Sequence, residues 1–144
     1  EELQLTPELK KDLGEIRHIE AITPKSWKKY AVHIIEPVLK ILKKNSILNC
    51  QLIDGFTHGG SSVLVRFENC VSARFTALGS EAVSPLSLRV FGDKGWVDLV
   101  FSDTFTSFKK AVSEFLNGIK NPCVKSPYDF NKKVVSIIEI GIIQ

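Results

Sequence analysis

The chain has 144 residues, of which 44% are hydrophobic and 24% charged, and this composition is typical of one globular domain with a single core. Its net charge of +3 comes from basic residues spread along the chain, so we expect no nucleic-acid partner. No apolar run reaches the roughly 20 residues that span a membrane. The first residues do not resemble a signal peptide, and Cys50, Cys70 and Cys123 fit no zinc motif. We therefore expect a reduced, cytoplasmic protein with no membrane partner.

Three elements are expected in the first third of the chain: a short helix, a strand and a long helix. They occupy residues 6–12, 15–22 and 27–44. The short helix begins at a Thr-Pro pair and ends at Gly14, and both features are typical of helix ends. The strand is predicted by apolar residues that alternate between Ile16 and Ile22.

The long helix is amphipathic, because its apolar residues recur at intervals of three and four and form one stripe. The stripe consists of Trp27, Tyr30, Ala31, Ile34, Ile35, Val38, Ile41 and Leu42. Four polar residues share a neighbouring face: Lys29, His33, Glu36 and Lys40. Pro37 donates no N–H, so the carbonyl of His33 lacks its usual helical partner. Two interpretations are open: a kinked packing helix, or a helix that builds a site around His33.

Strands are predicted over most of the middle of the chain. Their expected ranges are 50–58, 62–67, 70–78, 86–91 and 96–101. A tight turn at Glu68–Asn69 joins the second and third strands into a hairpin, and Gly92–Gly95 joins the last two. Both glycines of that second turn are predicted to need positive φ. Strand 70–78 alternates apolar and polar residues, which predicts one buried face and one more polar face.

The last third of the chain is predicted to hold one clear helix and one ambiguous segment. The helix covers about residues 103–119, and Gly118 and Pro122 are expected to end it. Its phenylalanines recur at helical spacing and are expected in the core, as is Trp96. In the ambiguous segment a Ser-Pro pair favours a helix start, whereas the Val- and Ile-rich residues 132–144 favour a strand by propensity.

These elements predict an α+β fold in a single domain over residues 1–144. We expect one open, predominantly antiparallel β-sheet of about five to six strands, with helices packed on one face.

Several short motifs follow one another in an order that is typical of one family. The first is Leu13-Gly14-Glu15-Ile16, and the histidine helix 27–37 follows it. The hairpin Leu88–Leu99 comes next, and then a helix that closes on segment 118–122. In this order the chain, over about residues 12–144, resembles the C-terminal domain of Gfo/Idh/MocA oxidoreductases, the family of glucose-fructose oxidoreductase and inositol dehydrogenase.

The resemblance implies the substrate-binding and oligomerisation domain of an NAD(P)-dependent oxidoreductase that acts on a sugar, polyol or related hydroxy compound. In this family an N-terminal Rossmann domain binds NAD(P) and carries a catalytic lysine. The sequence contains no GxGxxG unit after a strand, because Gly55–Gly60 has the wrong spacing and precedes a strand. We therefore expect that the Rossmann domain is absent from this chain, and that the chain alone binds no cofactor and is inactive.

The resemblance also implies candidate site residues. His33 matches the histidine that in many members exchanges a proton with the substrate hydroxyl, which suits a side chain that titrates near neutral pH. One turn earlier, where many members have aspartate, this chain has Lys29. A lysine there holds a substrate oxygen, replaces the acid electrostatically, or points to solvent. The family pocket is bordered by the segment of Lys25 and Trp27, so both residues, with Tyr30 beside Lys29, are expected substrate contacts.

A stand-alone α+β binding or dimerisation module without enzymatic activity is the alternative function. Both functions are compatible with a homo-oligomer that forms through the open face of the sheet. The residues expected on that face are Val63, Val65, Phe67, Val71, Ala73 and Phe75. The three histidines lie on separate elements without supporting carboxylates, so no metal site is expected.

Overall fold

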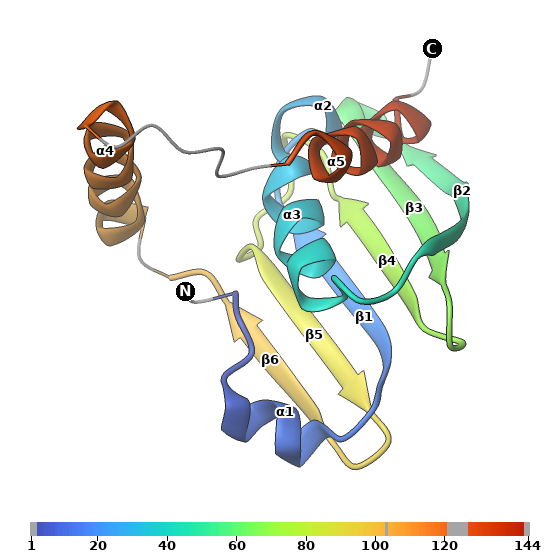
Figure 1. The fold of residues 1–144 in the computed structure, drawn as a ribbon. Coiled ribbons are helices and arrows are strands. Elements are labelled where there is room, and N and C mark those ends of the chain that lie inside the picture. The colour runs from blue at the N-terminus through green and yellow to red at the C-terminus, as the bar shows by residue number, and fades with distance from the viewer. Residues whose placement is uncertain (1–2, 103, 121–126, 143–144) are drawn as a thin grey trace.

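The computed structural model describes residues 3–102, 104–120 and 127–142. A single six-stranded sheet forms its centre, in the order β2-β3-β4-β1-β5-β6 (Figure 1). The strands are β1 (Ile16–Thr23), β2 (Ile47–Phe56), β3 (Gly60–Phe67), β4 (Ser72–Ala77), β5 (Ser87–Gly92) and β6 (Trp96–Val100). The described helices are α1 (Pro7–Leu13), α2 (Trp27–Tyr30), α3 (Val32–Ile41), α4 (Thr104–Lys120) and α5 (Tyr128–Ile140), with a 3₁₀ turn η1 (Thr57–Gly59). The predicted α+β class is confirmed.

The sheet is mixed but mostly antiparallel. Only the pair β1–β4 is parallel, whereas β2–β3, β3–β4, β1–β5 and β5–β6 are antiparallel. Both predicted hairpins, β3–β4 and β5–β6, are present. β1 is inserted between the two hairpins and joins them into one sheet. Because this pairing is long-range, the local patterns of the sequence do not predict it.

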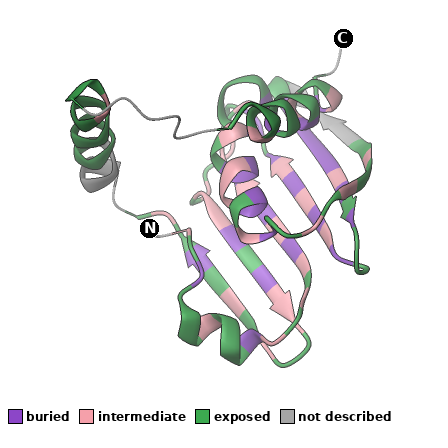
Figure 2. Ribbon diagram, in the orientation of Figure 1, coloured by how far each residue is buried: buried purple, intermediate pink, exposed green. Residues whose placement is uncertain are grey.

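One face of the sheet forms the core together with α2, α3 and α5 (Figures 1 and 2). The residues predicted to form an open dimer face lie in this core instead, so that part of the prediction is wrong. Val63, Val65, Phe67, Val71, Ala73 and Phe75 are all buried, together with Ile34, Ile35 and Val38 of α3. The alternation correctly showed that the strand residues share a face. It did not show which face the helices cover, because the crossovers between strands decide that.

The predicted helix 27–44 is divided into α2 and α3 at Ala31. The amide of Ile34 donates to the Ala31 carbonyl, three residues back, at 3.1 Å. Pro37 lies inside α3, so the helix continues through the residue at which a kink was considered. Most of the predicted apolar stripe is buried, although Tyr30 is 37% exposed. The helix ends earlier than expected, at Ile41.

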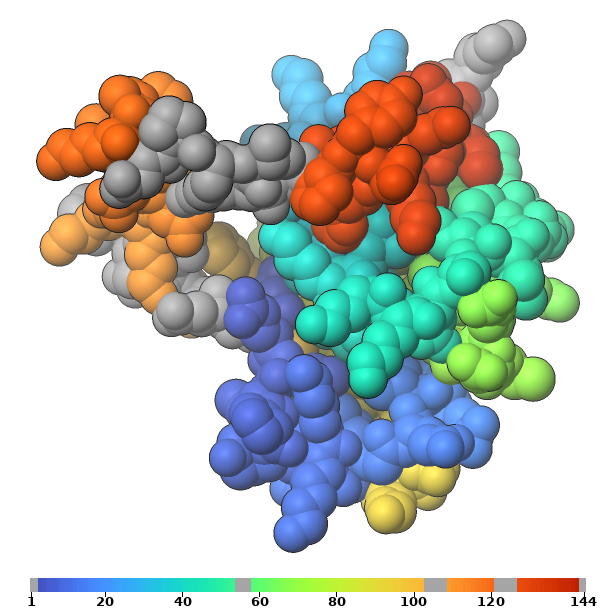
Figure 3. All heavy atoms as spheres, in the orientation of Figure 1, coloured from blue at the N-terminus to red at the C-terminus, as the bar shows by residue number. Residues whose placement is uncertain are grey.

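The ambiguous C-terminal segment is a helix over Tyr128–Ile140. α5 lies against α3 and β2, as Figures 1 and 3 show. Val134 and Ile137 of α5 are buried in the core, and the Trp27 indole donates to the Ile138 carbonyl at 2.8 Å. Burial of one apolar helix face therefore outweighs the strand propensity of the β-branched residues.

The predicted helix 103–119 is also present, as α4, but its predicted place in the core is wrong. Phe115 is 69% exposed, and Val112, Leu116 and Ile119 on the same face are 41–63% exposed. α4 stands apart from the sheet (Figures 1 and 3). Trp96, also predicted in the core, is 64% exposed on β6.

Some details at the end of α4 differ from the prediction or lie outside the structure. Gly118 is inside the helix, which runs to Lys120, so this glycine does not end it. Pro122, Cys123 and the side chains of Phe105 and Phe108 lie outside the described residues.

Two motifs of the family resemblance, separated by about 75 residues in the sequence, contact each other in the structure. The amide of Lys94 donates to the Leu13 carbonyl at 3.1 Å, and the Asp93 carboxylate accepts from the Glu15 amide at 2.8 Å. A Cβ on Gly92 would overlap the Leu13 carbonyl oxygen. The positive φ predicted for Gly92 and Gly95 is not found, since the residues with positive φ include neither of them. This close approach, rather than the turn, requires a glycine at position 92.

In the part of the chain that the structure describes, none of the helices is long and apolar enough to cross a lipid bilayer.

Candidate functional site

Three loops converge at the carboxyl ends of the parallel strands β1 and β4, next to the start of α2. The amides of Leu78 and Gly79 donate to the carbonyls of Thr23 and Lys25, at 3.0 and 3.3 Å. These bonds join the loop after β4 to the loop after β1. η1 completes the group, because Ser80 donates through its amide to the His58 carbonyl at 3.1 Å.

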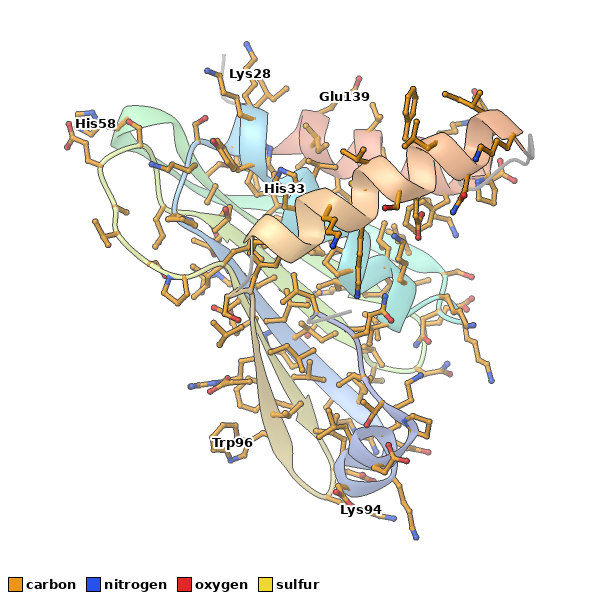
Figure 4. The ribbon with its side chains drawn as sticks, turned by 90° about the vertical axis from the view of Figure 1, so that its left-hand side faces the viewer. Lys28, His33, His58, Lys94, Trp96 and Glu139 are labelled. Atoms are coloured by element: carbon orange, nitrogen blue, oxygen red, sulfur yellow. The ribbon has the colours of Figure 1, made fainter. Side chains whose placement is uncertain are left out.

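His33 lies at the start of α3, immediately after the division between the two helices, and its side chain is exposed (Figure 4). The ring of Tyr30 lies 5.9 Å from the His33 ring, centroid to centroid, at an angle of 55°. The structure therefore brings together two of the five predicted site residues. An imidazole beside a phenol can exchange protons with a bound hydroxyl and donate a hydrogen bond to it.

Lys29 and Lys25 are both exposed at this end of the molecule. Lys29 lies in α2, on the residue before Tyr30, and Lys25 lies in the loop after β1. Lys28, between them in sequence, is also exposed. The site region thus carries three mobile ammonium groups that can reach an anionic or hydroxylated ligand.

Trp27, the fifth predicted site residue, is 2% exposed and has a structural role. Its indole N–H is used by the Ile138 carbonyl, and a Cβ on Gly141 would overlap the ring. Trp27 therefore fixes α2 to the end of α5. Its part in substrate binding stays a prediction that this buried position does not favour.

His58 is a polar residue of this region that sequence reasoning did not select. Its Nδ1 lies 3.3 Å from a carboxylate oxygen of Glu81, and its φ of 59° is unusual for a residue other than glycine. His58 lies at the same end of the molecule as Lys28 (Figure 4). The His-Gly-Gly turn is the only feature of the sequence that could have drawn attention to His58. No local pattern connects residues 58 and 81, so their contact could not be predicted.

The remaining histidine and an ion pair of α3 lie outside this region. Nδ1 of His18 is 2.7 Å from the Ser72 hydroxyl, on the sheet face opposite the helices, and its Nε2 is 3.0 Å from Glu20. Glu36 forms an ion pair with Lys40, with 3.7 Å between the carboxylate oxygen and the ammonium nitrogen. The structure thus keeps the three histidines on separate parts of the fold.

No family model matches the sequence, and no curated protein matches it. Solved structures of oxidoreductases match its fold. A myo-inositol 2-dehydrogenase from Lactobacillus plantarum is 15% identical with a TM-score of 0.68, and the match covers 89% of this chain and 54% of that chain. A UDP-N-acetylglucosamine 3-dehydrogenase from Acidithiobacillus ferrooxidans is 12% identical with a TM-score of 0.62, and the match covers 97% and 58%. A mutant 3-ketoreductase from Actinomadura kijaniata, in complex with TDP-benzene and NADP, is 14% identical with a TM-score of 0.61. The match covers 92% of this chain and 52% of that chain.

The chain has the fold of the Gfo/Idh/MocA C-terminal domain. It spans about half the length of each of the solved structures that it matches. The fold that the ordered motifs predicted is thereby confirmed. At 12–15% identity the likeness concerns the fold alone, so the roles of individual residues need their own tests.

The glycine-rich segment considered for a nicotinamide dinucleotide does not have the geometry of a dinucleotide-binding turn. The glycine-rich segment Gly55–Gly60 is the turn of the antiparallel hairpin β2–β3, not a turn that opens a helix after a strand. Within the described ranges, His, Cys, Asp and Glu side chains do not gather in groups of three or more, as a metal site would require. Burial raises the pKa of the Cys50 thiol, so a smaller fraction of this thiol is in the reactive thiolate form.

Proposed function

We propose that this chain is the C-terminal half of an NAD(P)-dependent oxidoreductase that acts on a sugar, a polyol or a related hydroxy compound. The observation that carries the proposal is the match of nearly this whole chain to about half of several such enzymes. A Rossmann domain on the N-terminal side would bind NAD(P), and the chain described here would bind the substrate and a second copy of itself. A cytoplasmic location is part of the same proposal.

In this proposal His33 exchanges a proton with the substrate hydroxyl. Its exposed position at the head of α3, beside Tyr30, supports this part, because the ring is open to a ligand that approaches from outside. Tyr30 donates a hydrogen bond to the same ligand. Lys29 and Lys25 hold further substrate oxygens, and Trp27 acts by fixing α2. NAD(P), when bound by the other domain, supplies the hydride chemistry.

A test of substrate binding uses the chain as it is. Titration with myo-inositol, followed by NMR, is expected to shift the backbone signals of residues 25–33 more than those of β6. The variant His33→Ala should reduce these shifts, whereas Lys40→Gln, which changes the far end of α3, should leave them unchanged. Equal shifts in all three proteins, or shifts confined to other regions, would count against the proposed site.

A second test concerns the division of labour between the two domains. The chain alone is expected to leave the fluorescence of NADH and NADPH unchanged and to show no turnover of myo-inositol with NAD or NADP. Turnover by the isolated chain would overturn the proposal that the cofactor belongs to another domain.

The alternative is a stand-alone α+β binding or dimerisation module without enzymatic activity. The face of the sheet opposite α3 and α5 favours it, since such a module needs a surface but no cofactor domain. The reading frame upstream of the codon for Glu1 distinguishes the two functions. An in-frame strand–GxGxxG–helix unit supports the oxidoreductase, and an initiation codon directly upstream supports the module.

A further inference from the structure

The two helices that present the candidate site are joined at a single residue, Ala31. Its amide donates to the Trp27 carbonyl at 3.0 Å, which completes α2. Its carbonyl accepts from the amides of Ile34 and Ile35, at 3.1 and 3.0 Å, which opens α3. A helix of one turn, such as α2, has little stability of its own. The direction of α2 therefore depends on what its side chains contact.

Trp27, the first residue of α2, contacts the carboxyl end of α5. Its side chain is 2% exposed, and its indole N–H donates to the Ile138 carbonyl at 2.8 Å. Ile138 lies in the last turn of α5, where carbonyls lack the usual intrahelical partner, and the same carbonyl accepts from the Gly141 amide at 3.1 Å. The indole thus helps to cap α5 and joins α2 to it. Figure 4 shows Lys28 of α2 and Glu139 of α5 at the same end of the molecule.

Gly141 determines how closely the indole can approach α5. A Cβ at this position would overlap three atoms of the Trp27 ring, Nε1, Cε2 and Cζ2. Gly141 is buried, and its φ of −83° is open to any residue, so its backbone conformation does not require a glycine. The space that it leaves for the indole does.

The position of α2 matters because α2 carries two of the candidate site residues. Lys29 and Tyr30 follow Trp27 within the same turn. The Tyr30 ring lies 5.9 Å from the ring of His33, which belongs to α3. Any change in the angle between α2 and α3 would change this separation.

Two other parts of the fold also touch this segment. α2 lies against β4, and a Cβ on Gly59 of η1 would come within 3.2 Å of the Ser26 side chain, just before α2. Within the described residues, however, the bond from Trp27 is the one hydrogen bond that a side chain of α2 makes. A hydrogen bond restricts direction more than a van der Waals contact does. The contact with α5 is therefore the one expected to set the direction of α2.

We infer that the carboxyl end of α5 positions the candidate site, with Gly141 as the positioning residue that acts through Trp27. The indole packs on Gly141 and bonds to Ile138, 111 residues away in the sequence, and so holds α2 where Tyr30 lies beside His33. That these side chains bind a substrate rests on the proposed function. That α5 positions them does not.

The experiment observes the site without a ligand. NMR of the original chain gives the backbone signals of residues 27–33 and the nuclear Overhauser effect between the rings of Tyr30 and His33. Gly141→Ala is expected to shift these signals and to weaken the ring contact, because its Cβ displaces the indole. Trp27→Phe keeps an aromatic ring and removes the indole N–H, so it should act in the same direction. It also tests the contact from the other side should Gly141→Ala not fold.

Two further variants separate positioning from a general loss of stability. Val134 is buried in α5 about two turns before Gly141. Val134→Ala therefore destabilises the same helix but should leave the signals of residues 27–33 in place. Trp27→Leu shortens the side chain, so that it no longer reaches the atoms that a Cβ at residue 141 overlaps. In that background Gly141→Ala should add little further change, because the contact through which it acts is gone.

Unchanged signals at residues 27–33 in Gly141→Ala and Trp27→Phe, or the same displacement in Val134→Ala, would overturn the inference. Full additivity of Gly141→Ala and Trp27→Leu would also overturn it, since residues that act through one contact are not additive. If the chain binds myo-inositol, Gly141→Ala should weaken that binding about tenfold, the usual effect of one lost hydrogen bond. Failure of the original chain to bind myo-inositol would count against the proposed function alone, because the spectra without ligand decide the positioning.

Discussion

At the residue scale, the most demanding position is Gly92, where β5 ends. The Leu13 carbonyl approaches the Gly92 backbone so closely that no side chain fits between them. This contact connects the turn after α1 to the β5–β6 hairpin. Sequence reasoning identified the glycine but gave it a conformational role, because a contact across about 80 residues leaves no local pattern.

The substitution Gly92→Ala is expected to lower the free energy of unfolding by about 1–3 kcal/mol, because its Cβ forces Leu13 to move within a packed region. Urea denaturation measures the change. Gly118→Ala is the matched control, since a Cβ there meets open space inside a helix. That variant should be more stable by up to about 1 kcal/mol, owing to the poor helix propensity of glycine. Similar effects at the two sites would contradict this account.

Thr23 is a second residue that the fold treats unusually. It is fully buried in the row that also contains Ala77 and Ser61, and within the described residues its hydroxyl has no hydrogen-bond partner. Thr23→Val keeps the shape and removes the unpaired group, so we expect a gain in stability of about 1 kcal/mol. Thr76→Val should instead reduce stability, because the Thr76 hydroxyl is bonded to Ser62 at 3.1 Å. A loss of stability in both variants would mean that Thr23 has a partner such as a buried water.

At the element scale, the predicted helix 27–44 contains a break that the sequence did not predict. The kink considered at its proline is not where the break lies. The division lies at Ala31, whereas Pro37 is contained within α3. A proline in a helix interior removes one donor, here the one that would reach the His33 carbonyl. The buried residues Ile34, Ile35 and Val38 hold α3 against the sheet and keep the helix in place around the proline.

Pro37→Ala is therefore expected to raise the free energy of unfolding by about 1 kcal/mol or more, since an amide at residue 37 can donate to His33. Thermal unfolding followed by circular dichroism measures the effect. Pro7→Ala is the control, because Pro7 lies at the first position of α1, where the missing N–H would have no helical partner. A gain at Pro7 as large as that at Pro37 would argue against the missing donor as the cause.

Both C-terminal helices show how far an element can be predicted from its own sequence. The helical spacing of its apolar residues identified α4 without its surroundings. For α5 the residue propensities favoured a strand, whereas the Ser-Pro pair favoured a helix start. The packing of Val134 and Ile137 in the core stabilises the helix. The helical spacing of apolar residues defines an apolar face but not the surface against which that face packs. The exposed Phe115 is an example.

At the scale of the whole molecule, the ion pair of β5 and β6 links stability to pH. Hydrogen bonds from Arg89 lower the pKa of Asp98 below its ordinary value of 3.8. A carboxyl whose pKa is depressed by folding stabilises the folded state above its unfolded pKa, and this contribution is lost as pH falls through the folded pKa. Since the pair lies at the surface, screening by solvent keeps this contribution small.

The prediction is that Asp98→Asn lowers stability at neutral pH and has little effect once the pH is below the lowered pKa of Asp98 in the folded state, where the original carboxyl is also protonated. Urea denaturation at several pH values measures this dependence. When Asp98→Asn is introduced into the variant Arg89→Gln, it should cause no pH-dependent loss of stability, because the arginine that lowers the pKa of Asp98 is already absent. An effect of Asp98→Asn that is equal at all pH values would show that packing, rather than charge, is responsible.

The sequence by itself determined the class of fold, the hairpins, the helices with strong periods and the helix that presents His33. These features depend on contacts between near neighbours, so they leave periodic patterns. Only the tertiary structure decided which face of the sheet is covered, that Trp27 is buried, and that His58 meets Glu81. It also aligned Arg74, Glu20, Arg89 and Asp98 into one alternating row. These outcomes depend on strand order and register, which bring together residues that no local pattern connects.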